Sequence, residues 1–167
     1  MSESDRVRIE PATDRDVPVL LSLIQSLADY ERLSHQVVAT EARLRESLFG
    51  ERPAAEAAIA YADGRHAGYA VWFHTFSTFI GKRGLYLEDV FVLPEFRGRG
   101  IGRALLGHVA QVAVARDCGR LEWAVLDWNE PAIGFYRRIG AGPVEGWSIF
   151  RIMGDPLQAL AESGAGS

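Results

Sequence analysis

Cysteine is almost absent from this sequence, in which Cys118 is the only one among 167 residues. An internal disulfide is therefore excluded, and a lone thiol fits a reducing compartment such as the cytoplasm. The sequence also lacks an apolar run approaching the roughly 20 residues that span a bilayer. Its first six residues do not have the basic-then-apolar order of a secretory signal peptide. We expect a cytoplasmic protein without a membrane partner.

Positively charged residues are in the minority: the chain has 18 Lys and Arg and 22 Asp and Glu, which gives a net charge of −4. This balance argues against nucleic acid as a partner. The four histidines are scattered without metal-ligand spacing, so no metal site is predicted. Arginines nevertheless gather at Arg97, Arg99 and Arg103. The carboxylates of interest lie elsewhere, at Glu31, Glu88, Asp89, Glu122 and Asp127. An acidic chain with one basic pocket suits an anionic cofactor and a cationic second substrate.

Apolar material, by contrast, is plentiful enough for a packed core. Hydrophobic residues make up 48% of the chain, and a chain of this length buries a sizeable core in one domain. We predict a single domain over residues 1–167. Its core is expected at about 6–153, with frayed ends at 1–5 and about 162–167.

Turn signals and apolar periodicity divide the chain into alternating elements. Asp63-Gly64 predicts a hairpin between two strands. Thr40 and Asn129 are predicted helix N-caps, and Thr13 begins a capping box. Strands are predicted over 7–10, 55–62, 66–76, 85–93, 120–126, 143–145 and 147–153, and helices over about 17–28, 41–49, 101–112 and 130–139. This order predicts an α/β fold with a mixed sheet.

One stretch combines a strand, a glycine-rich turn and a helix start. Apolar residues from Leu85 to Leu93 form the strand, which Pro94 stops. Gly98, Gly100 and Gly102 follow, just before an apolar helical run. Glycines let successive N–H groups point at one guest, and the helix dipole adds positive potential, so the turn predicts a phosphate-bearing cofactor. The alternative is a turn that only caps the strand.

Two common phosphate-binding motifs are excluded at this turn. A P-loop needs a lysine and a hydroxyl residue after its glycines, and neither follows here. The dinucleotide fingerprint needs a third glycine where this chain has Arg103.

Two carboxylates, Glu88 and Asp89, interrupt the otherwise apolar strand. Burial of an unpaired carboxylate is costly, so a pair in a central strand calls for a reason. Side-chain alternation places them on opposite faces unless a bulge intervenes. We interpret Glu88 as a general base for a protonated amine, acting directly or through water, and Asp89 as a structural residue. The alternative is that both lie at a solvated edge, or that Asp89 pairs with an arginine.

Tyr136 lies in the helix predicted after Asn129. A tyrosine there is usually a core or boundary residue, but a phenol beside a departing thiolate could donate a proton. Its spacing alone leaves both roles open.

These motifs together resemble those of the GCN5-related N-acetyltransferase (GNAT) family. Arg97-x-x-Gly100-x-Gly102 resembles its acetyl-CoA signature, and Asn-Glu-Pro-Ala-Ile-Gly-Phe-Tyr at 129–136 resembles its closing motif. The resemblance implies a mixed, mostly antiparallel sheet of about seven strands flanked by four helices. It implies acetyl-CoA as co-substrate, with Tyr136 as the catalytic acid and Glu88 as the base. The residues that it assigns to acetyl-CoA are Val90, Phe91, Val92, Arg97, Gly98, Arg99, Gly100, Ile101, Gly102, Arg103, Asn129, Glu130, Pro131, Ala132 and Tyr136.

Within this family the sequence is most similar to the diamine and thialysine acetyltransferase branch. Ala-Asp-Tyr-Glu at 28–31, Tyr-Leu-Glu-Asp at 86–89 and Trp-Asn-Glu-Pro at 128–131 are typical of that branch. Polyamine-specific members carry an extra acid where this chain has Ser77, which favours a smaller primary amine. The resemblance implies an amine pocket lined by Tyr30, Glu31, Glu88, Glu122, Trp123 and Ala124.

We therefore predict an acetyl-CoA-dependent N-acetyltransferase that modifies a primary amine of a small molecule by direct transfer in a ternary complex. The expected acceptor is a thialysine- or lysine-like amine or a di- or polyamine. Two alternatives stay open: the acceptor is a protein or antibiotic amine, or the chain is a CoA-binding sensor without turnover. The resemblance also implies a homodimer in which the last strands cross between subunits.

Overall fold

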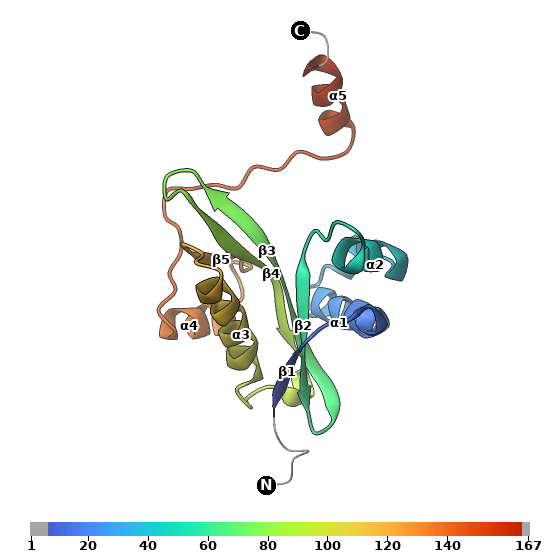
Figure 1. The fold of residues 1–167 in the computed structure, drawn as a ribbon, viewed down its shortest axis with the longest axis vertical. Helices are drawn as coiled ribbons and strands as arrows, with labels where there is room; N and C mark the ends of the chain where they lie inside the picture. The colour runs from blue at the N-terminus through green and yellow to red at the C-terminus, as the bar shows by residue number, and fades with distance from the viewer. Residues whose placement is uncertain (1–6, 165–167) are drawn as a thin grey trace. The chain divides into compact units, whose positions relative to one another are not determined.

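The computed structural model describes residues 7–164. The chain divides between Leu126 and Asp127 into two compact units. Within the described residues, the first unit contains one sheet and the helices α1, α2 and α3, and the second contains α4 and α5 (Figure 1).

The sheet of the first unit has the strand order β1-β2-β3-β4-β5. Its strands are β1 (Arg8–Pro11), β2 (Glu56–Ala62), β3 (Arg65–Ser77), β4 (Lys82–Val92) and β5 (Leu121–Trp123). Neighbouring strands are antiparallel from β1 to β4, and β5 is parallel to β4. The predicted mixed, mostly antiparallel sheet is confirmed, but the described residues form five strands rather than about seven, and five α-helices rather than four.

The predicted hairpin at Asp63-Gly64 joins β2 to β3. Both turn residues have left-handed backbones, with φ of 53° at Asp63 and 70° at Gly64. Such a two-residue turn matches the right-handed twist of the strands that it connects. The next connection is shorter than predicted, because β3 extends to Ser77 and β4 already begins at Lys82.

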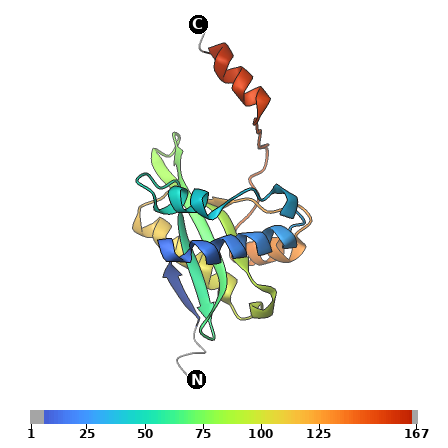
Figure 2. The same ribbon diagram turned by 90° about the vertical axis from the view of Figure 1, so that its right-hand side faces the viewer.

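Helices cover both faces of this sheet. The helices α1 (Val17–Tyr30) and α2 (Glu41–Phe49) lie on one face and α3 (Ile101–Ala115) on the other (Figures 1 and 2). Short 3₁₀ helices occur at η2 (Asp14–Asp16), η3 (Ser34–Gln36) and η4 (Pro94–Phe96). The core beneath α1 and α2 contains Leu20, Leu23, Leu48, Ala57, Ile59, Tyr69 and Phe91. This packing fixes the face of the sheet that Tyr69 and Phe91 share.

The predicted caps are present at three helix starts. The Thr13 N–H donates to Asp16 Oδ2 at 2.7 Å, which forms the predicted capping box. The Arg43 N–H donates to Thr40 Oγ1 at 3.2 Å. In the second unit, the Ala132 N–H donates to Asn129 Oδ1 at 3.4 Å and opens α4 (Glu130–Arg138).

The predicted strands over 143–145 and 147–153 are wrong. Residues 143–153 form no strand, and α5 (Asp155–Gly164) follows and covers the start of the tail for which we expected fraying. The stretch has the apolar side chains of a strand, but no neighbouring strand within residues 7–164 pairs with it. A ladder needs a partner strand, so strand propensity alone does not form one. Residues 1–5 and 165–167, also predicted to be frayed, lie outside the described residues.

Candidate active site

β4 separates from β5 beside the two acidic residues. β5 pairs only with Leu85–Leu87 of β4, which is why it is shorter than the strand predicted over 120–126. One residue later the β3–β4 register changes: Trp72 faces Leu87 but Val71 faces Asp89. Glu88 is therefore the extra residue of a β-bulge, the exception that the alternation argument allowed.

Beyond this bulge, one edge of β4 is open. Residues 89–92 pair with β3 on one side, and within the described part of the chain no strand pairs with them on the other. Backbone groups that point to this edge between Glu88 and Val92 are available to an extended ligand, as at other exposed sheet edges.

The glycine-rich turn leads from β4 through η4 into α3. Gly98 and Gly100 have φ of 76° and 77°, and Gly100 is the N-cap of α3. The first backbone bond of the helix joins the Ala104 N–H to the Gly100 carbonyl at 3.0 Å. Within the described residues, the N–H groups of Gly98, Gly100 and Ile101–Arg103 have no backbone acceptor. These donors at a helix N-terminus suit an anion.

Two arginines of the turn have different surroundings. Arg99 forms a bidentate ion pair with Asp63 of the β2–β3 hairpin, with N–O distances of 2.6 and 2.8 Å. This pair lowers the pKa of Asp63. Arg103 is exposed in the first turn of α3 and has no ion pair in the part of the chain that the structure describes. Arg99 therefore ties the turn to the hairpin, while Arg103 is better suited to meet a ligand phosphate.

Arg97 joins the turn to the end of α1. Its guanidinium lies over the ring of Tyr30, 4.6 Å from the centroid, and 5.5 Å from the ring centroid of Phe91. Its Nε donates to the Val92 carbonyl at 3.1 Å. The two rings are 6.2 Å apart. Tyr30, predicted for the amine pocket, thus lies beside the turn predicted to bind the cofactor.

A second cluster on this face is acidic. The buried Tyr69 donates its hydroxyl to Asp89 Oδ2 at 2.8 Å. Burial, and then the charge of Glu88, raises the pKa of Asp89, while the hydrogen bond from Tyr69 opposes that shift. Burial, and then the charge of Asp89, raises the pKa of Glu31. Neither Glu31 nor Asp89 has an ion pair within residues 7–164, so a cation from outside would find two carboxylates.

Sequence reasoning missed Tyr69. For Asp89 it considered a solvated sheet edge or a pair with an arginine. Within residues 7–164 no arginine pairs with Asp89, and a tyrosine takes that place. Tyr69 faces Phe91 across the β3–β4 pair, two positions from Asp89. Only the register of the two strands brings the hydroxyl to the carboxylate, and a single sequence carries no signal for that register.

Glu88 is exposed on the bulge, between this cluster and the end of β5. Burial, and then the charges of Glu88 and Glu122, raise the pKa of Tyr86, which pairs with Glu122 across β4 and β5. Glu122 itself forms an ion pair with Arg120 at 2.7 Å. Trp123 ends β5, and Ala124 is exposed just after it. Among the predicted pocket residues, the Glu122 carboxylate is therefore already paired with the Arg120 guanidinium.

The second unit holds the remaining predicted site residues. Asn129 is buried and caps α4, Pro131 lies in the first turn, and Tyr136 is half-buried with its ring centroid 5.6 Å from that of Phe135. Glu130 is exposed, and Ala132 is half-buried. The helix predicted to carry the catalytic acid is therefore formed, and Tyr136 lies toward its C-terminal end.

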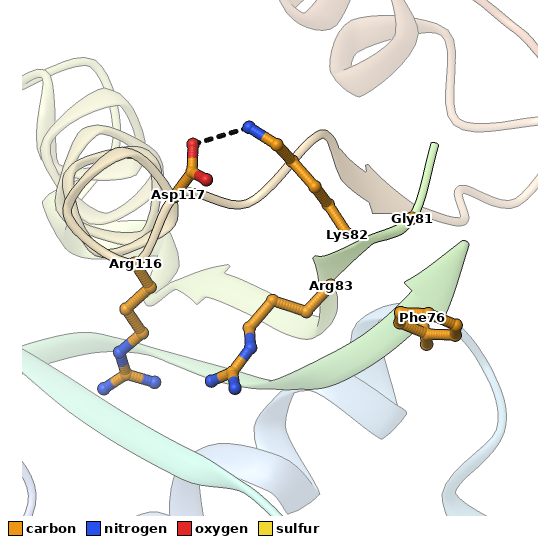
Figure 3. A pocket seen from close by; sticks show the side chains of 6 residues that line it. All are labelled: Phe76, Gly81, Lys82, Arg83, Arg116 and Asp117. Atoms are coloured by element: carbon orange, nitrogen blue, oxygen red, sulfur yellow. Dashed lines mark hydrogen bonds and ion pairs between the residues drawn. The ribbon is translucent and has the colours of Figure 1, made fainter. Parts of the chain in front are cut away.

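A cavity of about 350 Å³ lies at the other end of α3. Its lining residues are Phe76, Gly81, Lys82, Arg83, Arg116 and Asp117 (Figure 3). Lys82 pairs with Asp117 at 2.8 Å. α3 has 15 residues, so the cavity lies about 22 Å from the glycine-rich turn. None of the predicted site residues lines it.

The described residues contain no group of three or more side chains that could hold a metal ion. Nor does any helix among residues 7–164 have the length and apolar character needed to cross a membrane.

Comparison with known proteins decides the family. The family model described as acetyltransferase (GNAT) matches residues 22–141, which is most of the chain. The chain belongs to the GNAT family. Because of this membership and its acetyltransferase relatives, the protein is an N-acetyltransferase. GNAT acetyltransferases use acetyl-CoA as co-substrate.

Relatives are similar to this GNAT chain over nearly its whole length. A thialysine N-epsilon-acetyltransferase of Bos taurus is 41% identical over 93% of this chain and 97% of its own length. An L-ornithine N5-acetyltransferase of Arabidopsis thaliana is 32% identical over 92% of this chain and 87% of its own. Among solved structures, an integron cassette protein of V. cholerae has a TM-score of 0.79 at 27% identity, covering 96% of this chain and 99% of that one. The predicted resemblance to the GNAT family is confirmed.

Proposed function

We propose that this GNAT enzyme transfers the acetyl group of acetyl-CoA to a primary amine of a small molecule. The acceptor is a thialysine- or lysine-like amine, or a di- or polyamine. One observation carries the choice of a cationic acceptor: Asp89 lies on β4 where its edge is open, its charge acts on Glu31, and neither carboxylate has an ion pair in residues 7–164. The names of the relatives from Bos taurus and Arabidopsis thaliana support it, because both specify a side-chain amine of an amino acid.

Residues of β4 and the glycine-rich turn are proposed to hold the co-substrate. Acetyl-CoA supplies an acetyl group on a thioester. The N–H groups of Gly98, Gly100 and Ile101–Arg103 lack backbone acceptors in the described structure, which suits the pyrophosphate. The open edge at Val90–Val92 suits the pantetheine arm. The proposed set is completed by Arg97, Arg99 and residues 129–132. Arg99 contributes by holding the turn to the hairpin through its ion pair with Asp63.

Glu88 and Tyr136 are the proposed acid–base residues. The acceptor arrives as an ammonium ion and must lose a proton before its nitrogen can attack a carbonyl carbon. Glu88 is exposed at the bulge, where it can take that proton directly or through water. A backbone N–H near Val90 stabilises the developing oxyanion, and Tyr136 protonates the departing sulfur. The transfer is direct, in a ternary complex, and Tyr30, Glu31, Glu122, Trp123 and Ala124 line the acceptor side.

A panel of amines tests this proposal. Thialysine, lysine, ornithine, spermidine, an aminoglycoside and a peptide with a free N-terminus are each incubated with acetyl-CoA, and CoA release is followed with a thiol reagent. Preferred turnover of the amino acids or the polyamine supports the proposal. Preferred turnover of the peptide or the aminoglycoside contradicts the acceptor class. Binding of acetyl-CoA without CoA release for any amine would make the chain a sensor.

We further propose that the protein acts as a homodimer in the cytoplasm. The exposed apolar stretch 143–153 supports the dimer, because Trp147 and Phe150 are 81% and 95% exposed in the single chain. The lone, half-buried Cys118 supports a reducing compartment. We treat the two units as one acetyltransferase domain, because the family match over 22–141 crosses the boundary at Leu126.

A further inference from the structure

We propose that Tyr69 is a positioning residue for the amine acceptor. Its buried hydroxyl holds one oxygen of Asp89 and leaves the second oxygen for the ammonium group. This inference rests on the proposed amine acetylation and adds to it a residue that touches neither substrate.

The position of the Tyr69 hydroxyl is fixed by packing. Tyr69 has no exposed surface and belongs to the core cluster formed with Leu20 and Leu23 of α1. Its ring therefore cannot turn away without opening that core. The bond of 2.8 Å from its hydroxyl to Asp89 Oδ2 crosses from β3 to β4. Asp89 is consequently held in one orientation at the first paired residue after the bulge.

The charges around Asp89 leave a place for a cation. The groups that act on it are Tyr69 from β3 and the neighbouring Glu88 on β4, and Asp89 in turn acts on Glu31 at the end of α1. None of these is basic. The basic residue of the adjoining turn, Arg97, lies over Tyr30 and Phe91 and donates to the Val92 carbonyl. A half-buried carboxylate with acidic neighbours gains most from a cationic ligand.

The first test compares pH profiles of Tyr69→Phe and the wild type, with thialysine as acceptor. Loss of the hydroxyl removes a bond that favours the ionised form, so the pKa of Asp89 rises. We expect the acceptor KM near pH 6 to increase about tenfold, the scale of one hydrogen bond to a charged group. The acidic limb of kcat/KM for the acceptor should move to higher pH, while the KM of acetyl-CoA stays constant. Tyr61→Phe is the control, because Tyr61 of β2 packs on the same core and donates no bond to a carboxylate among the described residues.

The second test is a double-mutant cycle with Asp89→Asn. If Tyr69 acts through Asp89, adding Tyr69→Phe to Asp89→Asn should change the acceptor kcat/KM no further. Additive losses, or an acidic limb that Tyr69→Phe does not move, would overturn the proposal. An unchanged acceptor KM in Asp89→Asn would also overturn the proposal. That single variant gives a test even if Tyr69→Phe does not fold.

A third readout separates this inference from the proposed function. The Asp89 carboxyl is titrated by ¹³C NMR in the wild type and in Tyr69→Phe, without any substrate. A titration moved to higher pH in the variant supports the bond's role even if no amine is acetylated, in which case only the acceptor proposal fails. An unmoved titration contradicts the positioning role even in an active enzyme.

Discussion

At the scale of single residues, Glu88 is the group whose removal should reveal how the acceptor loses its proton. Glu88→Gln cannot take that proton, so turnover then depends on the acceptor molecules already in the free-amine form. That fraction falls about tenfold for each pH unit below the amine pKa. We expect a loss of about 10²–10⁴-fold in kcat/KM, largest at low pH. The measurement is a pH profile beside Glu95→Gln, an exposed residue of η4 outside the site. An equal loss at every pH would argue against a base.

Tyr136 is the residue whose role the sequence alone left open. Tyr136→Phe keeps the ring that packs beside Phe135 and removes only the hydroxyl. We expect kcat to fall about 10²–10⁴-fold, since positioned acid catalysis is worth that much. The affinity for acetyl-CoA, measured by calorimetry, should stay within about twofold. Full turnover in this variant would remove Tyr136 from the mechanism.

Glu31 provides a prediction about stability. Its pKa is raised by burial and by Asp89, so the folded protein keeps the Glu31 proton at pH values where the unfolded chain has lost it. Stability is therefore lost as the pH rises above the ordinary value of 4.5. Glu31→Gln lacks this loss, so its free energy of unfolding should exceed that of the wild type by roughly 0.5 kcal/mol at pH 7 and by nothing near pH 4. The difference is small because solvent screens a half-buried group. Urea unfolding at both pH values measures it, and an equal change at both would contradict the assignment.

The residue scale also shows what a single sequence can and cannot give. The cost of carboxylates in an apolar strand was enough to single out Glu88 and Asp89. Their relative directions depended on the bulge, which exists only because β3 and β4 change register between Val71 and Trp72. The bond from Tyr69 depends on the same register. Local chemistry was readable, whereas contacts between strands required the pairing itself.

At the scale of elements, the start of α3 should determine co-substrate affinity. Gly100 has φ of 77°, and a Cβ there would meet no atom within 4 Å, so Gly100→Ala costs strain without a clash. We expect a loss of about 1 kcal/mol in stability. We also expect about tenfold weaker acetyl-CoA binding, the scale of one charge-assisted hydrogen bond. Thermal unfolding and calorimetry measure the two effects.

Gly107 of the same helix supplies the matched control for Gly100. It is exposed and helical, and a Cβ added to it would also meet no atom within 4 Å. Gly107→Ala should stabilise the protein by up to about 1 kcal/mol through helix propensity and leave acetyl-CoA affinity unchanged. Equal affinities in both variants would indicate that the turn does not bind the co-substrate.

Elements with strong local signals were predictable, and those that need partners were not. The Asp63-Gly64 hairpin and the caps at Thr40 and Asn129 agree with the sequence, because each depends on residues a few positions apart. β5 is shorter than predicted because its pairing with β4 ends at Leu87. The strands predicted over 143–153 failed for a related reason: within the described chain, nothing pairs with that stretch.

At the scale of the whole molecule, the stretch 143–153 raises the question of what covers it. Val144, Trp147, Ile149, Phe150 and Met153 are each more than 60% exposed. Such a run of large apolar side chains is unfavourable in water and typical of an interface. A second copy would bury these side chains on both subunits, because a two-fold interface uses the same patch of each. We therefore expect the protein to sediment as a dimer.

Trp147→Ser combined with Phe150→Ser should disrupt that dimer. Each buried side chain contributes about 1.5–3 kcal/mol, and a symmetric interface loses four of them. Dissociation should then be favoured by at least about 1,000-fold, which analytical ultracentrifugation over a dilution series detects. Val38→Ser is the control, because Val38 is 71% exposed but lies in the first unit, far along the chain from this stretch. A wild-type monomer at every concentration, or equal weakening in the control, would contradict an interface at 143–153. Retained turnover in a monomeric double variant would further show that each subunit acetylates its acceptor independently.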